Sequence, residues 1–259
     1  MNLRLILSAA LVMIASSASA ADTLSASELA SRLSALRQDG ASYVRLRMEI
    51  KGAKQETLQV QIKQRWTKSS SEVVYQVLFP KERKGESVLL KRAGNHSATG
   101  STFTPPNTVR TISDMKEPLF GSDLSSEDVI DNFYAWDQQA LVGAEVVEGV
   151  SCQILESKPG KGEHSSYASV RSWIDTKRLA PMRIEKYSGS GQLLRRIDTT
   201  RVVADAGHFI PANLAVRGPH PDSSTLLDGS RIKHDVSYTD ADFSVEGLKE
   251  INIPRGSPE

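Results

Sequence analysis

Histidine, acidic and cysteine side chains are the residues of this sequence that could act chemically, and their spacing limits what they can do. The five histidines include no i, i+4 pair, the spacing that places two zinc ligands on one helix face. They are His96, His164, His208, His220 and His234. We expect each of them to be a surface or loop residue. No Gly-x-Ser-x-Gly motif occurs, so a hydrolase with a nucleophile elbow is not supported.

Two segments could bind an ion, and each has a simpler interpretation. Residues 159–162 read Pro-Gly-Lys-Gly, but the segment lacks the Walker spacing and lies between predicted strands, so we expect a solvated turn. Glu127, Asp128 and Asp131 could bind a cation, although acids in the first turn of a helix are explained by the helix dipole. The sequence therefore predicts no catalytic residue, no metal site and no cofactor.

Cys152 is the only cysteine, so stability must come from packing rather than from an intramolecular disulfide. It alternates with Val150 and Ile154 on one face of a predicted strand, which indicates a buried thiol that reacts slowly. Three tryptophans could line a ligand site, although aromatic residues on strands usually belong to the core. They are Trp66, Trp136 and Trp173.

Residues 1–20 have the three-part pattern of a secretory signal. Arg4 precedes an almost unbroken apolar run, and small residues at positions 18 and 20 form the site that a signal peptidase needs. The run is shorter than the ~20 apolar residues of a transmembrane helix. No cysteine follows the cleavage site, so a lipid anchor is not expected. We expect a soluble periplasmic chain that begins at Ala21.

The charge of the chain argues against one class of partner. Lys and Arg together number 32 and Asp and Glu 31, so the chain is almost neutral. A neutral chain lacks the broad positive field that attracts the phosphates of nucleic acids. We therefore expect no nucleic-acid partner.

Two segments have helical signatures. Ser25 and Glu28 fit a capping box, and leucines follow at spacings of four and three residues until Gly40. A second helix is expected over residues 125–134, with Ser125 as its N-cap and acidic residues in its first turn. These are the only helices that the sequence predicts.

Most of the remaining chain alternates apolar and polar residues, which is typical of strands with one buried face. The expected strands cover residues 44–50, 58–62, 73–79, 86–91, 108–112, 144–147, 150–155, 167–174, 182–187, 192–203, 209–216 and 230–238. Residues 95–107 are polar and contain prolines, so they are expected to form a loop. Short turns between consecutive strands predict an antiparallel meander. We expect a mainly β (α+β) fold, a single domain over residues 21–259 with one strongly curved antiparallel sheet, closed wholly or partly into a barrel.

Two stretches of the chain resemble a known family. The first contains FP at 79–80, KG at 84–85, LL at 89–90, VRTI at 109–112 and FGSDLSSEDV at 120–129. The second contains RSWID at 171–175, LAPMRI at 179–184, Tyr187, Gly191, FIP at 209–211 and the segment from Phe243 to Leu248. Their order and spacing are similar to those of the outer-membrane lipoprotein-sorting proteins, the LolA-like group, and to its longer branch with the Gly-Ser-Asp segment.

The resemblance implies a fold and a function. The fold would be an open half-barrel with a few helices over its concave face, and that apolar face would hold acyl chains. The protein would be a monomeric periplasmic carrier or chaperone for lipid or acylated protein in outer-membrane sorting, and not an enzyme. An envelope transporter would be a further partner. The alternative is a protein that docks on such a transporter and carries nothing. The family's lid-contacting arginine cannot be matched to Arg45, Arg47 or Arg65, so its gating mechanism is not carried over.

Six aliphatic residues are the candidate lipid-binding site. They alternate along two neighbouring predicted strands, next to the N-terminal helix, and include no aromatic residue. They are Val44, Leu46, Met48, Leu58, Val60 and Ile62. Aliphatic side chains can form an adaptable surface that suits flexible hydrocarbon. The alternative is that the same residues pack beneath the N-terminal helix.

Two local expectations concern segments that the resemblance includes. Residues 121–132 combine a glycine hinge, an N-cap and a short acidic helix, and we expect them at the rim of the half-barrel rather than in its core. An ordinary connecting helix is the alternative. In the hairpin around Pro181, we expect Trp173 to pack across to Ile184.

Overall fold

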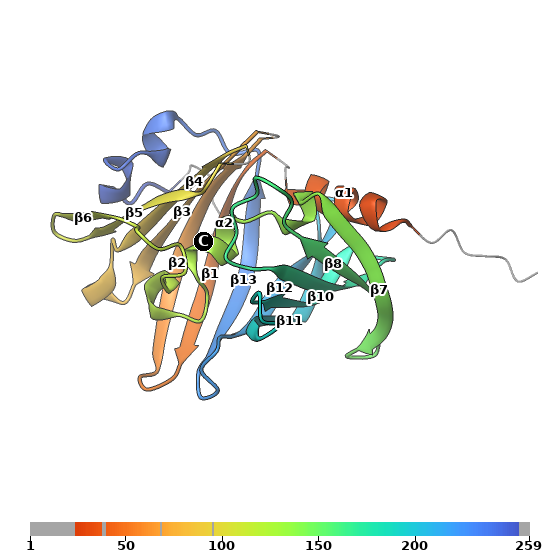
Figure 1. Ribbon diagram of the computed structural model, residues 1–259. Coiled ribbons are helices and arrows are strands. Elements are labelled where there is room, and N and C mark those ends of the chain that lie inside the picture. Colours follow the sequence, from red (N-terminus) through yellow and green to blue (C-terminus); the bar gives the residue numbers. More distant parts are fainter. Residues whose placement is uncertain (1–23, 38–39, 68, 95, 254–259) are drawn as a thin grey trace, which may run out of the picture.

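A computed structural model describes residues 24–37, 40–67, 69–94 and 96–253. The predicted signal sequence, residues 1–20, lies outside the described residues. In the described part of the chain, thirteen strands form one antiparallel sheet that curves around a central segment containing α2 (Figure 1). The mainly β, curved and open fold confirms the predicted fold class.

The strands follow one another across the sheet in the order β6-β5-β4-β3-β2-β1-β13-β12-β11-β10-β9-β8-β7. The chain therefore starts in the middle of the sheet, builds one side outward to β6, and returns to the middle from the other edge, β7. The bounds are β1 (Ala41–Lys51), β2 (Glu56–Trp66), β3 (Ser70–Phe79), β4 (Ser87–Ala93), β5 (Thr99–Thr104), β6 (Thr108–Thr111), β7 (Gln138–Val147), β8 (Val150–Lys158), β9 (Ser169–Asp175), β10 (Ala180–Tyr187), β11 (Leu193–Asp205), β12 (His208–Arg217) and β13 (Ser224–His234).

The helices are few and short. They are α1 (Ala26–Arg37), α2 (Ser126–Ile130) and the 3-10 turns η1 (Lys81–Arg83), η2 (Leu119–Gly121), η3 (Phe133–Ala135), η4 (Asp240–Phe243) and η5 (Gly247–Lys249). The predicted capping box starts α1, because the Ser25 amide donates to Glu28 at 3.0 Å and the Glu28 amide donates to the Ser25 hydroxyl at 3.3 Å. The predicted second helix is shorter than expected, since α2 ends at Ile130.

Two local predictions are wrong. The expected loop over residues 95–107 contains β5, which pairs with β4 and β6. The strand has little apolar alternation to reveal it, because Phe103 is its only large apolar residue. Trp173 lies opposite Arg183 rather than Ile184, because the register shifts between Pro181 and Arg183. The guanidinium of Arg183 lies 5.4 Å from the centre of the Trp173 ring.

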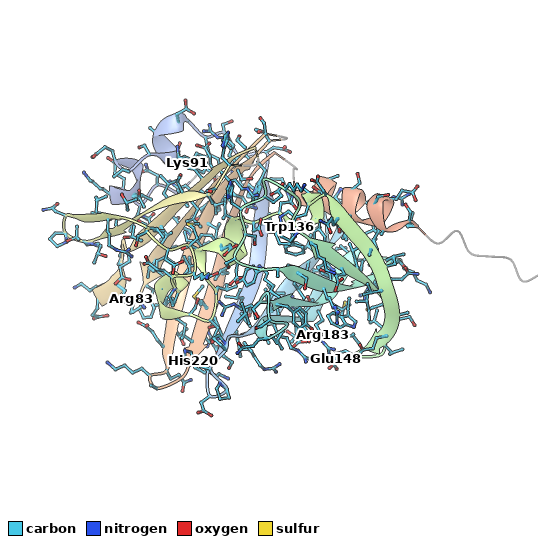
Figure 2. All side chains as sticks on the ribbon, viewed as in Figure 1. Arg83, Lys91, Trp136, Glu148, Arg183 and His220 are labelled. Atoms are coloured by element: carbon cyan, nitrogen blue, oxygen red, sulfur yellow. The ribbon has the colours of Figure 1, made fainter. Side chains whose placement is uncertain are left out.

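The concave side of the sheet contains two apolar clusters. Helix α1 packs through Leu29, Ala30 and Leu33 in the cluster beside β7 to β9, with Trp136 near the start of β7 (Figure 2). The six candidate lipid-binding residues belong to the other cluster or pack against it. The alternative that these six residues pack beneath the N-terminal helix is therefore wrong, because α1 packs on the opposite half of the sheet.

Part of the convex side of the sheet is covered by the C-terminal segment. The C-terminal residues 235–253 place Phe243 and Leu248 over Val74, Leu89 and Phe103. Their helical turns are the blue segments outside the sheet in Figure 1.

Cys152 lies on the convex side of the sheet, in a separate cluster with Val150 and Ile154 packed beside it. It is 2% exposed, and burial raises the pKa of its thiol. The predicted burial and strand face of Cys152 are confirmed, and its slow reaction remains a prediction.

Candidate functional site

The sheet opens along a seam between β12 and β13. These two strands pair only from Asn213 with Asp228 to Val216 with Thr225 within the described chain. Beyond that ladder, β12 stays paired with β11 as far as His208, and β13 stays paired with β1 as far as His234. Pro211 suits a strand beside a seam, because proline has no amide hydrogen to donate to a ladder.

Two adjoining cavities occupy the seam on the concave side, with volumes of about 530 Å³ and about 370 Å³. Both lie in the range of ~300–1,000 Å³ that is usual for small-molecule sites. Asp205, Ile210 and Ile232 line both, so the cavities form one continuous space. We call this space the seam pocket.

The larger part of the seam pocket is aliphatic. Its apolar walls come from four strands on both sides of the seam, and include Val44, Leu46, Val203, Ile210, Leu214, Leu227 and Ile232. Gly229 also lines this part, and a Cβ there would approach the Ala212 carbonyl oxygen at 3.2 Å. A side chain at 229 would therefore meet the β12 backbone beside the pocket.

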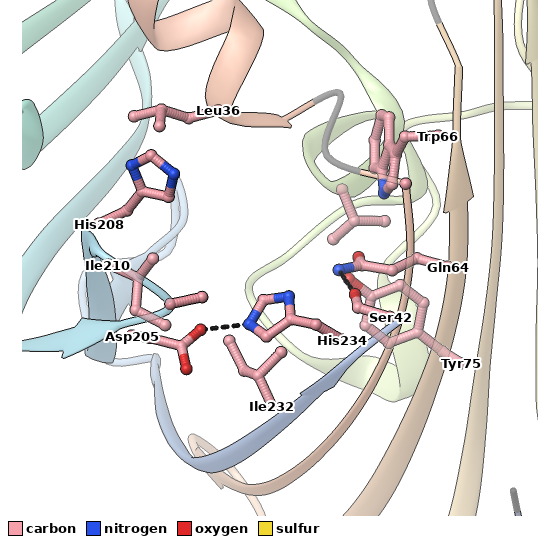
Figure 3. Close-up of a pocket in the computed structure, with 13 residues that line it drawn as sticks. Leu36, Ser42, Gln64, Trp66, Tyr75, Asp205, His208, Ile210, Ile232 and His234 are labelled. Atoms are coloured by element: carbon pink, nitrogen blue, oxygen red, sulfur yellow. Dashed lines mark hydrogen bonds and ion pairs between the residues drawn. The ribbon is translucent and has the colours of Figure 1, made fainter. Parts of the chain in front are cut away.

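The smaller part of the seam pocket has a mixed lining, with apolar residues such as Trp66 beside most of the pocket's polar groups, and lies near the C-terminal end of α1; we call it the polar part. Figure 3 shows Asp205 and His208 on the β11–β12 side and His234, Ser42 and Gln64 on the other side. The Nε2 atom of His234 lies 2.5 Å from Oδ2 of Asp205, so this pair joins the two sides across the open seam. The Gln64 amide donates to the Ser42 hydroxyl at 2.5 Å. The seam pocket is therefore amphipathic along its length.

A segment of chain fills much of the remaining concave space. We define the plug as residues 119–131, which include η2 and α2. Leu119, Leu124 and Ile130 of the plug are at most 5% exposed and share one cluster with Met48 and Val60 of the sheet. The expectation that residues 121–132 lie at the rim is wrong, because the apolar plug residues are part of the main core.

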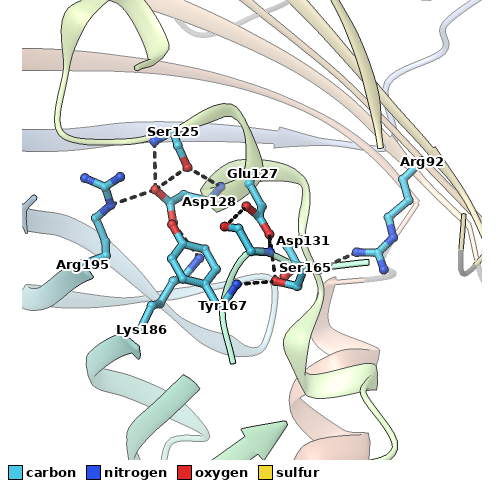
Figure 4. Close-up of polar contacts among 10 residues, drawn as sticks. Arg92, Ser125, Glu127, Asp128, Asp131, Ser165, Tyr167, Lys186 and Arg195 are labelled. Atoms are coloured by element: carbon cyan, nitrogen blue, oxygen red, sulfur yellow. Dashed lines mark hydrogen bonds and ion pairs between the residues drawn. The ribbon is translucent and has the colours of Figure 1, made fainter. Parts of the chain in front are cut away.

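Asp128 ties the plug to the second half of the sheet (Figure 4). Its side chain is 0% exposed, and it lies 2.8 Å from Nζ of Lys186 and 3.0 Å from Nε of Arg195. The Tyr167 hydroxyl also donates to it at 2.8 Å. Burial alone would raise the pKa of Asp128, but the two cations and the hydrogen bonds lower it to about 2.

Other acidic residues tie the plug to neighbouring strands and loops. Asp131 pairs with Arg92 of β4, which also pairs with Glu163 at 2.8 Å. Asp123 accepts hydrogen bonds from the hydroxyls of Thr225 at 2.8 Å and Ser223 at 2.6 Å.

Glu127 accepts from the Ser165 hydroxyl at 2.8 Å. Glu127, Asp128 and Asp131 thus all form hydrogen bonds or ion pairs with other side chains. These contacts, more than the helix dipole suggested from the sequence, explain why acidic residues occur at these positions.

The structure separates the six candidate lipid-binding residues into two groups. The prediction that they lie on neighbouring strands is confirmed, because Val44 lies opposite Ile62, Leu46 opposite Val60 and Met48 opposite Leu58. Val44 and Leu46 line the seam pocket. The other four are at most 7% exposed and pack in the cluster that includes the plug.

Of the other residues of the seam pocket, sequence reasoning named only Trp66 as a possible ligand-site residue. Ile210, Leu214 and Ile232 lay on predicted strands but were not grouped with Val44 and Leu46. His208 and His234 were assigned to the surface or loops; His208 is indeed exposed and His234 is half-buried, and both also line the smaller part of the pocket, which was not expected. The available signal was Pro211 inside an alternating apolar segment, which indicates a strand with an unpaired side.

Comparisons with known proteins agree on the fold. A family model described as "Uncharacterized protein" matches residues 69–250. A solved DUF1329 family protein from Desulfovibrio piger is 25% identical, with a TM-score of 0.79 over 86% of this chain and 97% of that chain. A protein described as an outer membrane lipoprotein-sorting protein domain, from Vibrio parahaemolyticus, is 20% identical, with a TM-score of 0.77 over 87% of this chain and 98% of that chain.

A LolA superfamily protein from Nitrosomonas europaea is 17% identical, with a TM-score of 0.69 over 87% of this chain and 100% of that chain. The fold that the resemblance to the LolA-like group implied is therefore confirmed. A search of curated proteins gave no match. Among the described residues, none of the helices has the length and apolar character that crossing a membrane requires.

Proposed function

We propose that this chain, which belongs to the family whose model matches residues 69–250, is a periplasmic carrier or chaperone that binds acyl chains of lipid or lipoprotein. The observation that carries the proposal is the seam pocket, an open space with aliphatic walls at one end and polar groups at the other. The fold shared with lipoprotein-sorting and LolA superfamily proteins supports a binding role rather than catalysis. The signal-like residues 1–20 support the periplasmic location.

The apolar walls are sufficient for reversible binding. Burying roughly fifteen methylene groups at ~0.8 kcal/mol each contributes on the order of 12 kcal/mol. Association costs ~4–15 kcal/mol in lost freedom, so the net affinity is modest. A modest affinity suits a carrier, which must release its cargo as well as collect it.

A second function is favoured by one feature, the edge strand β7. Its Leu141, Val142 and Val146 are 37%, 47% and 64% exposed, and an apolar edge strand is a template for pairing with another chain. This edge supports the alternative of an interaction protein that docks on an envelope transporter and carries no lipid. The two functions differ in whether the seam pocket is ever occupied.

The test fills the pocket with a large side chain. Leu46 is half-buried and lines the aliphatic part, so the indole of Leu46→Trp can enter the cavity without displacing core atoms. Val60→Trp is unsuitable because Val60 is 0% exposed and overpacking a core is destabilising. Val146→Trp on the exposed edge is the matched control.

Native mass spectrometry of protein purified from the periplasm measures the bound lipid. We expect the parent and Val146→Trp to carry acyl lipid, and Leu46→Trp to carry at least about tenfold less while keeping a parent-like unfolding transition. Equal lipid on both variants would show that the seam pocket is not the site. A parent that stays lipid-free after incubation with lipid would favour the docking protein.

A further inference from the structure

The plug and the seam pocket together set the size of the cargo. We infer that the ligand is an amphiphile with a single acyl chain, held with the chain in the aliphatic part of the seam pocket and the polar group beside Gln64, Asp205 and His234. This inference rests on the proposed function and narrows its substrate class. Ligands with two or three chains, including triacylated lipoprotein, would then be poor cargo.

The first argument is that most of the concave apolar face is already occupied. Met48, Leu58 and Val60 are 0% exposed because Leu119, Leu124 and Ile130 of the plug are packed in the same cluster. A second acyl chain could reach these residues only if the plug moved away. What remains open is the seam pocket, where Val44 and Leu46 are the contribution of β1.

The second argument is that the plug is held by buried charges rather than by apolar contacts alone. Moving it out would separate Asp128 from Lys186 and Arg195, whose side chains are at most 12% exposed. It would also separate Asp131 from Arg92. Removing one partner from a buried ion pair leaves an uncompensated charge in a weakly solvated site, which is strongly unfavourable. An acyl chain offers no charge to replace the lost partner.

The third argument is the polarity along the pocket. The aliphatic walls favour hydrocarbon, whereas the polar part presents an amide, a hydroxyl and the Asp205–His234 pair at one end. An amphiphile bound along the seam would satisfy both parts at once. A polar group at this end would lie beside the C-terminal residues of α1, including Leu36 (Figure 3).

The experiment compares two lipids that differ in the number of chains. Lysophosphatidylcholine and phosphatidylcholine of the same short chain length are added to the delipidated chain below their critical micelle concentrations. Affinity is measured by titration calorimetry and stoichiometry by native mass spectrometry. We expect one lysophosphatidylcholine per chain and at least about tenfold weaker binding of phosphatidylcholine. The Leu46→Trp variant is expected to lose the lysophosphatidylcholine complex.

The remaining outcomes distinguish this inference from the proposed function. Phosphatidylcholine binding as tightly as lysophosphatidylcholine would overturn the single-chain inference and leave the carrier function supported. Two lysophosphatidylcholine molecules per chain, both lost in Leu46→Trp, would overturn it in the same way, because the pocket would then hold two chains. Binding of neither lipid, with the parent also lipid-free from the periplasm, would overturn both.

Discussion

Asp128 and Asp131 lie three residues apart in the plug, yet their ionisation is shifted in opposite directions. Both side chains are almost completely buried, and burial by itself raises the pKa of a carboxyl. Lys186 and Arg195 together outweigh burial at Asp128, whose pKa falls to about 2. At Asp131, burial, helped by the nearby Glu127, outweighs the attraction of Lys186 and Arg92, so the pKa is raised. The ionised form of Asp128 is therefore the one that the folded state stabilises.

Replacing Asp128 by Asn is expected to destabilise the protein strongly. The substitution leaves Lys186 buried without its anionic partner, a change that typically costs about 3–5 kcal/mol. Urea unfolding at neutral pH measures the free energy of unfolding. Glu246→Gln is the matched control, since Glu246 pairs with Lys249 at a similar 2.7 Å but its side chain is 80% exposed. Exposed pairs contribute only about 0–1 kcal/mol, so the control should remain near the parent.

The same variant changes the response to acid. The pKa of Asp128 is about 2 in the folded state and near 3.8 in the unfolded chain. The ionised carboxylate therefore stabilises the folded state fully above about pH 4. This stabilisation is lost as the pH falls from about 4 to about 2, and the contribution is on the order of 2 kcal/mol. This part of the acid destabilisation should be absent in Asp128→Asn. Parallel curves of unfolding free energy against pH for parent and variant would contradict a lowered pKa of Asp128 in the folded state.

At the scale of elements, strands with clear alternation were predicted and strands without it were not. Alternation identified β1 and β2, their shared face and their neighbourhood in the sheet, and the structure adds the facing pairs, such as Leu46 with Val60. It missed β5, whose only large apolar residue is Phe103, because that strand is held by its pairing with neighbours. It also misplaced the partner of Trp173, because a register shift leaves no mark on the periodicity of a single strand.

The C-terminal residues 235–253 are expected to act as part of the core. Phe243 is 0% exposed, packs against Tyr238 with ring centres 5.3 Å apart, and lies 4.8 Å from the Arg65 guanidinium carbon. Phe243→Ala should cost about 3–5 kcal/mol of unfolding free energy, the usual cost of removing a buried aromatic ring. Urea unfolding of Phe209→Ala, whose ring is 40% exposed, provides the comparison. A loss for Phe243→Ala as small as that expected for the exposed Phe209 ring would show that residues 235–253 do not stabilise the sheet.

At the scale of the whole molecule, the plug joins parts of the chain that sequence patterns cannot connect. Asp128 meets Lys186 across 58 residues, Asp131 meets Arg92 across 39, and Asp123 meets Thr225 across 102. Periodicity is read within short windows, so it predicted α2 but not what α2 would contact. The seam pocket could not be found from short windows either, because its walls come from β1 near the start of the chain and from β11 to β13 near its end. The family resemblance predicted the half-barrel, whereas the packing of the plug determines which part of its concave face stays open.

Val129 and Ile130 are adjacent in α2 but lie on different sides of the plug, so shortening each of them should have a different effect. Val129 is half-buried and lines the polar part of the seam pocket, whereas Ile130 is 1% exposed within the main core. Ile130→Ala should lower the unfolding free energy by about 2–5 kcal/mol, because the core cannot fully close the cavity.

Val129→Ala should change stability by less than about 1 kcal/mol, because solvent already reaches that side chain. It should instead weaken lysophosphatidylcholine binding by up to about fourfold, the equivalent of one methylene, because the head-group end of the ligand loses an apolar contact with Val129. Urea unfolding and calorimetric titration of the two variants separate these effects, and both substitutions shorten a β-branched residue in the same short helix. Because the two residues are adjacent, a general loosening of α2 would affect both measurements in both variants. That result would contradict a plug whose one face is fixed in the core while its other face forms a wall of the pocket.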